Sequence, residues 1–206
     1  MRFDPVTLEG EFVRIVPAEE SHAEAIAEFT TDELVAMLAG RPKAADAAGI
    51  AQRTRELIDS PRYTPLTILD KSSERPIGVT MYINENDRDR ATEIGGTWLD
   101  PRLHGSACNP DCKLALLTHA FESVGVVRVQ FRGDARNTQS RKAVEKLGAT
   151  FEGVMRKHMP IRAADDTITG YRDSFVYGIT DDEWPACRET IRALIDTRRT
   201  RGSGRA

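Results

Sequence analysis

Between two segments of different periodicity the chain reads Arg102-Leu103-His104-Gly105-Ser106-Ala107-Cys108-Asn109-Pro110-Asp111. The residues before it alternate and end at Leu99, and apolar residues recur at helical spacing after it, so we expect a loop between a strand and a helix. Asn109 is expected to cap that helix, with Pro110 at its first position and Asp111 in its first turn. The free backbone N–H groups of a helix start, behind a loop of small side chains, favour a phosphate-like anion.

A plain connection is the alternative interpretation of this loop, since links of the type strand–glycine turn–helix are common and Pro110 has no N–H group. Two nucleotide-binding motifs are absent from it. No Gly-Lys-Ser/Thr sequence follows the loop, which excludes a Walker A site, and three spaced glycines are missing, which excludes the dinucleotide-binding pattern.

Length and composition indicate one sizeable core. With 206 residues, 40% of them hydrophobic, we expect a single domain over residues 1–197, followed by a basic, disordered tail at 198–206. The net charge of −3 gives no overall attraction to nucleic acid or membrane, and no apolar run is long enough to span a bilayer. The N-terminal residues do not have the pattern of a signal peptide, so we predict a cytoplasmic protein.

The three cysteines, Cys108, Cys112 and Cys187, are too few for a disulfide framework. Cys108 and Cys112 are four residues apart and have no nearby pair of histidines, so we expect no metal site. We interpret all three as small, partly buried thiols in a reducing compartment.

The remaining periodicities predict an α/β fold in the order strand, two helices, three strands, helix, strand, helix, two strands and a C-terminal helix. Because hairpins dominate the middle of the chain, the sheet should be mixed and mostly antiparallel, with about seven strands flanked by helices. The strands are expected at 11–17, 63–69, 76–83, 91–99, 127–132, 151–161 and 170–179, and the helices at 18–29, 44–58, 109–124, 137–147 and after a capping box at 180–183.

Two adjacent glycines interrupt the strand that leads into the loop. Gly95-Gly96 in a strand interior indicates a bulge, or the close approach of another backbone or a ligand. A weak, twisted strand is the alternative interpretation. A bulge would splay the strand and leave backbone N–H groups free to meet a ligand.

Several motifs, in the same order along the chain, resemble the Gcn5-related N-acetyltransferase (GNAT) superfamily. Arg102-x-x-Gly105-x-Ala107 is similar to the Gln/Arg-x-x-Gly-x-Gly/Ala loop that holds the pyrophosphate of acetyl-CoA in that superfamily. The stretches that resemble the RimJ/RimL-like branch are Asn137-Thr138-Gln139-Ser140, Lys146-Leu147-Gly148-Ala149, Glu152-Gly153, Leu8-Glu9-Gly10, Tyr171-Arg172-Asp173 and Glu183-Trp184-Pro185. The resemblance runs over nearly the whole chain and implies an acetyl-CoA-dependent enzyme.

The chain departs from the family pattern at one point. Some members that acetylate ribosomal proteins carry a catalytic glutamate on the strand after the Glu-Gly pair. Here the corresponding stretch is Met155-Arg156-Lys157-His158-Met159, which has no carboxylate. The resemblance therefore does not imply their particular protein substrate.

The resemblance implies that the backbone from His104 to Asn109 holds the pyrophosphate, and that the pantetheine arm pairs with the glycine-containing strand like an added strand. The residues implied in cofactor binding are Trp98, Leu99, Arg102, His104, Gly105, Ser106, Ala107, Cys108, Asn109, Asn137 and Arg141. Lys113 and Lys142 are further candidates for phosphate neighbours, with solvated surface charge as the alternative.

A polar stripe marks the helix expected at 137–147. Asn137, Ser140, Val144 and Leu147 fall on one helix face. From the residues alone, Ser140 could bond a backbone carbonyl while Asn137 only caps the helix. The resemblance instead implies that Ser140 is the catalytic group that gives a proton to the departing CoA thiolate.

The general base is open among several candidates. A lysine-like acceptor amine has a pKa of roughly 10, so it must lose a proton before it attacks. Glu93 lies on the strand of the expected thioester site, and the resemblance favours a carboxylate there. His158, Asp173 and a chain of water molecules are the alternatives.

We therefore expect an N-acetyltransferase that moves the acetyl group of acetyl-CoA to a primary amine of a small molecule or a protein N-terminus, by direct attack in a ternary complex. A non-catalytic acyl-CoA-binding or regulatory domain is the alternative, and a protein- or ribosome-binding module that uses the basic tail is a third hypothesis. The acceptor slot should be shaped by residues 30–44 and 162–169. We expect no nucleic-acid or membrane partner. We include a homodimer among the expected assemblies only because relatives of this family often form dimers.

Overall fold

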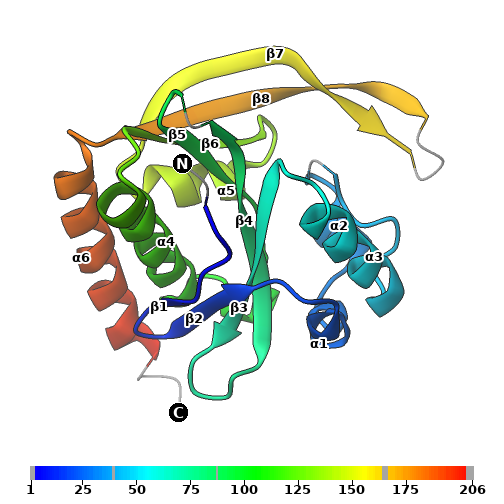
Figure 1. The fold of residues 1–206 in the computed structure, drawn as a ribbon, viewed down its shortest axis with the longest axis horizontal. Helices are drawn as coiled ribbons and strands as arrows, with labels where there is room; N and C mark the ends of the chain where they lie inside the picture. The colour runs from blue at the N-terminus through cyan, green and yellow to red at the C-terminus, as the bar shows by residue number, and fades with distance from the viewer. Residues whose placement is uncertain (1–2, 39, 87, 164–166, 203–206) are drawn as a thin grey trace.

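The computed structural model describes residues 3–38, 40–86, 88–163 and 167–202 and contains one eight-stranded sheet (Figure 1). The strand order is β1-β2-β3-β4-β5-β6-β8-β7, and every neighbouring pair is antiparallel except β5 and β6. The strands are β1 (Leu8–Glu9), β2 (Val13–Pro17), β3 (Tyr63–Asp70), β4 (Pro76–Asn86), β5 (Ala91–Leu99), β6 (Arg128–Asp134), β7 (Thr150–Arg162) and β8 (Ile168–Thr180).

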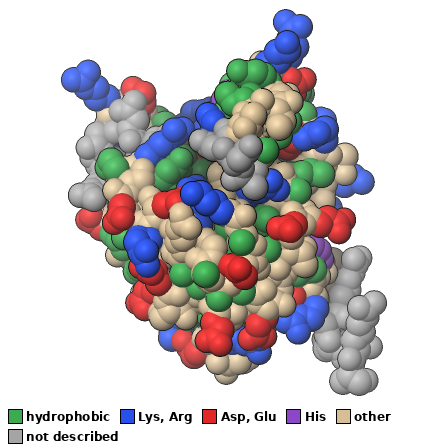
Figure 2. Space-filling model, turned by 90° about the vertical axis from the view of Figure 1, so that its right-hand side faces the viewer, with side chains coloured by type: hydrophobic (Ala, Val, Ile, Leu, Met, Phe, Trp, Pro, Cys, Tyr) green, Lys and Arg blue, Asp and Glu red, His purple; other side chains and the backbone are tan. Residues whose placement is uncertain are grey.

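Two groups of helices flank the sheet. The helices are α1 (Ala23–Ala27), α2 (Asp32–Val35), α3 (Ala47–Ile58), α4 (Cys108–Thr118), α5 (Thr138–Glu145) and α6 (Trp184–Gly202). In Figure 1, α4 and α6 lie on the left of the strands and α1 to α3 on the right, while the long β7–β8 hairpin crosses the top. Figure 2 turns the right-hand side toward the viewer, with charges of both signs over its lower part. No helix in the described ranges is long and apolar enough to cross a membrane.

The predicted mixed, mostly antiparallel sheet is confirmed, with one strand more than expected, because the two-residue β1 pairs with β2. Only one half of the capping box predicted before the last helix is present: Glu183 accepts hydrogen bonds from the backbone N–H and the hydroxyl of Thr180, but its own N–H donates to the Thr180 carbonyl. Helix α6 runs to Gly202, so residues 198–202, predicted to belong to a disordered tail, are helical. Residues 203–206 of that predicted tail lie outside the described residues.

The predicted start of α4 is wrong. The helix begins at Cys108, its N-cap is Ala107, and Asn109 therefore lies inside the first turn. The chain already turns through a short 3-10 segment at Pro101–Leu103 and bends at Gly105, whose φ is +84°. This brings Ala107 into helical geometry two residues before Asn109 could cap the helix.

The core lies mainly between the sheet and the pair α4 and α6. Its fully buried side chains include Ile15, Ile68, Leu116, Leu117 and Ile191, and these come from β2, β3, α4 and α6. Burial of apolar surface of this kind stabilises the fold by about 25 cal/mol per Å². A smaller cluster forms on the other side, where Ile26, Phe29 and Ile50 of the α1–α3 group pack with Trp98 of β5.

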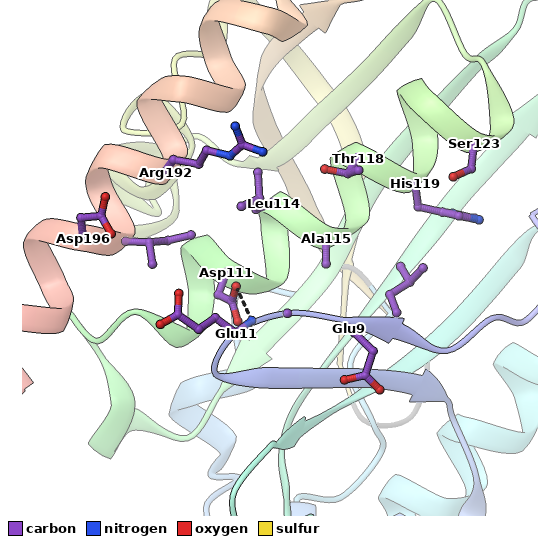
Figure 3. A pocket seen from close by; sticks show the side chains of 13 residues that line it. Glu9, Glu11, Asp111, Leu114, Ala115, Thr118, His119, Ser123, Arg192 and Asp196 are labelled. Carbon is purple, nitrogen blue, oxygen red and sulfur yellow. Dashed lines mark hydrogen bonds between the residues drawn. The ribbon is translucent and has the colours of Figure 1, made fainter.

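Asp111 of α4 fixes the N-terminal segment to this core. Its carboxylate accepts hydrogen bonds from the backbone N–H groups of Glu11, Phe12 and Val13 at 3.0, 2.7 and 3.1 Å. The side chain is 2% exposed, and Figure 3 shows it pointing from α4 toward Glu11. A Cβ atom on Gly10 would lie 2.3 Å from Oδ2 of Asp111, so the chain needs glycine there.

Lys113, two residues further along α4, is the second buried charge of this helix. Its ammonium group donates to Thr97 Oγ1 at 2.8 Å and to Thr80 Oγ1 at 3.4 Å, and the residue is 6% exposed. No carboxylate forms an ion pair with Lys113 within the described part of the chain. Burial therefore lowers the pKa of Lys113 below the usual lysine value of 10.5.

We predict that Asp111→Ala lowers the free energy of unfolding by about 3 kcal/mol, because three backbone donors lose a buried acceptor. Chemical denaturation of the variant and of the wild type measures the difference. Asp182→Ala, at an exposed position, is the control and should stay within about 0.5 kcal/mol of the wild type. An equally small change in Asp111→Ala would contradict the anchoring role.

We predict that Lys113→Met raises the free energy of unfolding by roughly 1 kcal/mol or more at neutral pH, because a buried unpaired cation is removed. The folded-state pKa of Lys113 is lowered, so at pH values between it and the unfolded value of 10.5 the unfolded state of the wild type binds more protons than the folded state. The free energy of unfolding of the wild type therefore rises with pH in this range. The advantage of the variant should therefore shrink toward high pH in denaturation curves recorded from neutral pH up to the usual lysine pKa.

Lys43→Met, at an exposed lysine, is the matched control and should give a difference that does not depend on pH. A Lys113→Met protein that is less stable than the wild type by a constant amount across this range would disprove the assignment of an unfavourable buried charge.

Candidate active site

The parallel strands β5 and β6 separate early and leave an open wedge in the sheet. Their pairing starts at Ala91 opposite Arg128 and ends at Glu93 opposite Gln130. Beyond that point β5 continues to Leu99 and β6 to Asp134 without pairing to each other. The edge of β5 that follows Glu93 therefore has no neighbouring strand on the β6 side.

A β-bulge bends β5 away at the same place. Val79 of β4 pairs with Trp98, but Met81 pairs with Gly95, so β5 has one extra residue between these two pairs. Gly96 in the bulge has φ of +58°, and a Cβ atom there would lie 2.4 Å from Cε of Met81. The bulge predicted from the two glycines is confirmed, and the alternative of a merely twisted strand is not needed.

The wedge opens into a cavity of about 480 Å³ that contains most of the predicted site. Its walls include residues 93–99 of β5, residues 131–134 of β6, the α4 loop and one face of α5. The predicted site residues that line it are Glu93, Trp98, Leu99, His104, Gly105, Asn109, Asn137 and Ser140. On the α2 side the wall is formed by Leu34, Met37 and Leu38, which belong to one of the two segments expected at the acceptor slot.

The loop before α4 presents unused backbone donors. The described residues provide no hydrogen-bond acceptor for the N–H groups of Gly105, Ala107 and Asn109. Gly105 has open space around the position of a Cβ atom. The loop is held from outside, since Arg198 of α6 donates to the carbonyl of Ser106 at 2.8 Å. Such a set of N–H groups at the start of an eleven-residue helix suits a phosphate group.

The face of α5 carries the predicted polar stripe toward the cavity. Asn137, Ser140, Val144 and Leu147 all line the wall. Asn137 caps the helix, because its side-chain oxygen accepts the N–H of Ser140 at 2.9 Å. The hydroxyl of Ser140 makes no hydrogen bond to the backbone or side chains in the described ranges, so the alternative of a bond to a backbone carbonyl does not apply.

Five residues predicted to bind the cofactor have side chains away from the cavity wall. Ala107 and Cys108 are buried in the core, and Ser106 accepts the N–H of Cys108. Arg102 forms an ion pair with Asp100. Arg141 donates to the Tyr177 hydroxyl at 2.9 Å and lies over the Phe151 ring, because it sits on the helix face next to the Ser140 stripe.

Glu93 is the one candidate base that lines the cavity. Its carboxylate belongs to a residue that is 5% exposed, and it accepts hydrogen bonds from Arg132 and, at 3.3 Å, from Gln130. Gly95 keeps space open above it, since a Cβ atom there would lie 3.3 Å from Oε1 of Glu93. The carboxylate is thus paired with a cation on one side and faces the wedge on the other.

The two alternative bases lie outside the cavity wall. His158 has Nε2 3.2 Å from an Arg132 nitrogen and Nδ1 3.0 Å from the Ser174 hydroxyl. Because arginine only donates, Nε2 accepts and Nδ1 carries the proton. Burial, then Arg132 and Arg172, lower the pKa of His158, so the imidazole is held neutral. Asp173 accepts the N–H of Lys157 at 2.7 Å and is exposed.

Several arginines in the cavity wall were not expected from the sequence. Among them, Arg62 and Arg172 come from outside the predicted loop and helix, and Arg198 comes from the predicted tail. The Tyr171-Arg172-Asp173 motif is part of the family resemblance, but no local sequence pattern indicates that Arg172 lines a cavity. Residues 162–169 were the second segment expected to shape the acceptor slot. Met159 and Arg172, from the strands on either side of that segment, line the cavity instead, and residues 164–166 lie outside the described residues.

A second, more open cavity of about 520 Å³ lies between β1, α4 and α6 (Figure 3). Glu9, Glu11, His119 and Arg192 are among its lining residues, and it includes no predicted catalytic or cofactor-binding residue.

The cysteines take no part in either cavity. All three are buried, and burial raises the pKa of the Cys112 thiol to about 12. The described residues contain no group of three or more His, Cys, Asp or Glu side chains suited to a metal ion.

Comparisons with known proteins identify the family. The acetyltransferase (GNAT) domain matches residues 13–150, more than half of the chain. A Thermus protein, from T. thermophilus, that is assigned as an acetyltransferase has 32% sequence identity and a TM-score of 0.84, covering 94% of this chain and 98% of that one. The comparison with curated proteins gave no match.

Two more distant structures share the fold. RimJ from Mycobacterium smegmatis, solved with CoA-disulfide, has 19% identity and a TM-score of 0.75, covering 94% of this chain and 96% of that one. The ribosomal-protein-S5-alanine acetyltransferase from Vibrio fischeri has 21% identity and a TM-score of 0.67, covering 87% and 98%. The predicted resemblance to the RimJ/RimL-like branch therefore holds at the level of the fold.

The open wedge, the bulge and the donor-rich loop fit an extended cofactor with a diphosphate, and the family uses acetyl-CoA. The predicted enzyme class and cofactor are confirmed by the family match. The chain belongs to the GNAT acetyltransferase family and is an acyl-CoA-dependent N-acetyltransferase.

Proposed function

We propose that this chain transfers the acetyl group of acetyl-CoA to a primary amine by direct attack in a ternary complex. The observation that carries the proposal is the wedge between β5 and β6, which has unused N–H donors at one end and Glu93 and Ser140 on its walls. One cavity thus offers places for a diphosphate, a thioester and an amine. Simultaneous binding of both substrates lets the amine attack without a covalent enzyme intermediate.

The residues of the loop would hold the cofactor. The N–H groups of Gly105, Ala107 and Asn109 suit the diphosphate, and Arg198 and Lys142 add positive charge to the same cavity. The edge of β5 from Ile94 to Leu99 is free to pair with an extended pantetheine arm as a strand would. When bound, acetyl-CoA supplies a thioester carbonyl for attack and a thiol as the leaving group.

Glu93 is assigned the role of general base. An alkyl ammonium has a pKa of roughly 10, so most acceptor amines carry a proton at neutral pH. The Glu93 carboxylate can take this proton directly or through one water molecule, and Arg132 keeps the carboxylate oriented toward the wedge. Backbone N–H groups near the Gly96 bulge can then donate to the carbonyl oxygen as it gains negative charge.

Ser140 is assigned the role of proton donor to sulfur. Its hydroxyl lies on the α5 face that lines the cavity and has no partner in the described ranges. A hydroxyl in this position can stabilise the leaving thiolate and pass on to it the proton that the attacking nitrogen loses, so that serine ends the step neutral. The Asn137 cap orders the first turn of α5, in which Ser140 lies.

The acceptor is proposed to be a small-molecule amine or a protein N-terminus. The structural relatives include an enzyme named for ribosomal protein S5, but identity below 25% supports only a common fold. This chain also lacks a carboxylate on Met155–Met159 of β7. A cytoplasmic location and a homodimer stay predictions.

We predict that the protein releases thiol from acetyl-CoA when given a panel of amines and N-terminal peptides, and that Ser140→Ala lowers kcat by about tenfold to a hundredfold. The KM for acetyl-CoA should change little, because the hydroxyl acts on the leaving sulfur. Thr138→Ala, at an exposed position of the same helix, is the control. An unchanged kcat in Ser140→Ala would remove the proton-donor role, and CoA binding without turnover of any amine would instead favour a non-catalytic domain.

We predict that Glu93→Gln lowers kcat by at least about a hundredfold at neutral pH, because the amide cannot accept the ammonium proton. Arg132→Gln is the comparison that separates chemistry from structure, since it breaks the same ion pair but leaves the carboxylate. It should lose clearly less activity than Glu93→Gln. Equal losses in the two variants would show that Glu93 acts only as the partner of Arg132.

A further inference from the structure

The cavity wall is strongly positive. Eight Lys or Arg residues line it, against two acidic residues, Glu93 and Asp134. Both acids are neutralised by arginines, Glu93 by Arg132 and Asp134 by Arg136. The cofactor's diphosphate accounts for the cations near the α4 loop and α5, but not for those at the opposite end, near α2 and β8.

Arg172 is the central cation of that opposite end. It extends from β8 across to the segment after α2, where one terminal nitrogen donates to the carbonyl of Met37 at 3.0 Å. Among the described residues, the other terminal nitrogen donates only to the sulfur of Met159 at 3.4 Å, which is a weak acceptor. The Nε–H group is buried without a hydrogen-bond partner in the described part of the chain.

The charge of Arg172 is likewise not balanced by an ion pair within the described ranges. Burial is the main cause that lowers its pKa below the usual arginine value of 12.5, while Asp134 and Glu93 act in the opposite direction from a distance. Arginine keeps its proton in proteins even so. A charged guanidinium with unused donors on a cavity wall is costly unless a ligand completes its hydrogen bonds.

Arg172 is separated from the place proposed for the diphosphate. Its neighbours are Met37 and Met159, whereas the α4 loop contacts α5 and α6 through Gln139 and Arg198. In Figure 1, α2 lies to the right of β4 and α4 lies to its left. Figure 2 shows Lys and Arg side chains on the upper part of the face that is on the right in Figure 1.

We propose that Arg172 recognises an oxyanion on the acceptor, so that the substrate class is a primary amine that also carries a carboxylate or a phosphate group. Each terminal nitrogen of the Arg172 guanidinium carries a second N–H besides the one directed at Met37 or Met159, and this planar pair can bind either oxyanion with two parallel hydrogen bonds. The amine end would then lie toward Glu93, and Arg172 would fix the other end of the molecule. This inference rests on the proposed function, because it names the acceptor of the same site.

The test compares matched acceptors at saturating acetyl-CoA. One arm pairs ω-amino acids and acidic N-terminal peptides with their carboxamides, and a second arm pairs aminoethyl phosphate with aminoethanol. The anionic member of at least one pair should have a kcat/KM about tenfold or more above its neutral partner, mostly through KM. The arm that shows the preference identifies which oxyanion is bound.

The variant Arg172→Gln should reduce this preference to about twofold or less, mainly by raising the KM of the anionic acceptors. Arg172→Lys should recover part of the preference, since it restores the charge without the planar fork. Arg156→Gln, at an exposed arginine of β7 outside the cavity, is the matched control and should keep the preference. Equal kcat/KM for the charged and neutral members of every pair in the wild type would overturn the inference and leave the proposed function intact.

Binding of N-acetylated products, measured by titration calorimetry with CoA present, gives a readout that does not need turnover. The N-acetyl derivative of an anionic amine should bind the wild type at least about tenfold tighter than its neutral counterpart, and this difference should disappear in Arg172→Gln. If this holds while no amine is acetylated, the oxyanion site stands and the proposed function fails. If neither product binds through Arg172, the inference is wrong whatever the kinetic result.

Discussion

The early separation of β5 from β6 is the constraint on which the site depends. Parallel strands that stay paired use their backbone N–H and C=O groups in hydrogen bonds to each other. Strands β5 and β6 pair only as far as Glu93 and Gln130. The extra residue at Gly96 turns β5 outward, and β5 pairs with β4 both before and after the bulge. A strand edge in the middle of a sheet is thereby left open, and an open edge presents donors and acceptors that an extended ligand can complete.

Features that depend on neighbouring residues could be predicted from the sequence, and features that depend on packing could not. Gly95-Gly96 predicted the bulge, and three- and four-residue spacing predicted the stripe of Asn137 and Ser140, because both signals are local. Arg172 and Arg198 reach the cavity from distant elements, and an arginine in a strand or helix resembles surface charge until its neighbours are known. The first turn of α4 was misplaced because the preceding 3-10 turn, not a capping side chain, sets its start.

The charges around the wedge favour the reactive form of an amine. Glu93 is neutralised by Arg132, and His158 is held neutral by burial and by the arginines beside it. An ammonium group that enters such a positive site gains little and loses its hydration, so its pKa falls toward neutrality. The same positive field would hold an oxyanion on the acceptor at Arg172 while making the amine easier to deprotonate at Glu93. Binding of the acceptor and activation of its nitrogen would then arise from one arrangement of cations.

Helix α4 connects the parts of the site that must stay in register. Its first turn binds the segment before β2 through Asp111, and Lys113 just beyond contacts Thr97 next to the bulge. The loop with the unused donors continues directly into the same helix. A shift of α4 along its axis would therefore move the loop with the unused donors and the bulge together, which keeps the spacing between them constant. A buried lysine costs stability, and this fixed spacing gives a physical reason why the fold retains one behind β5.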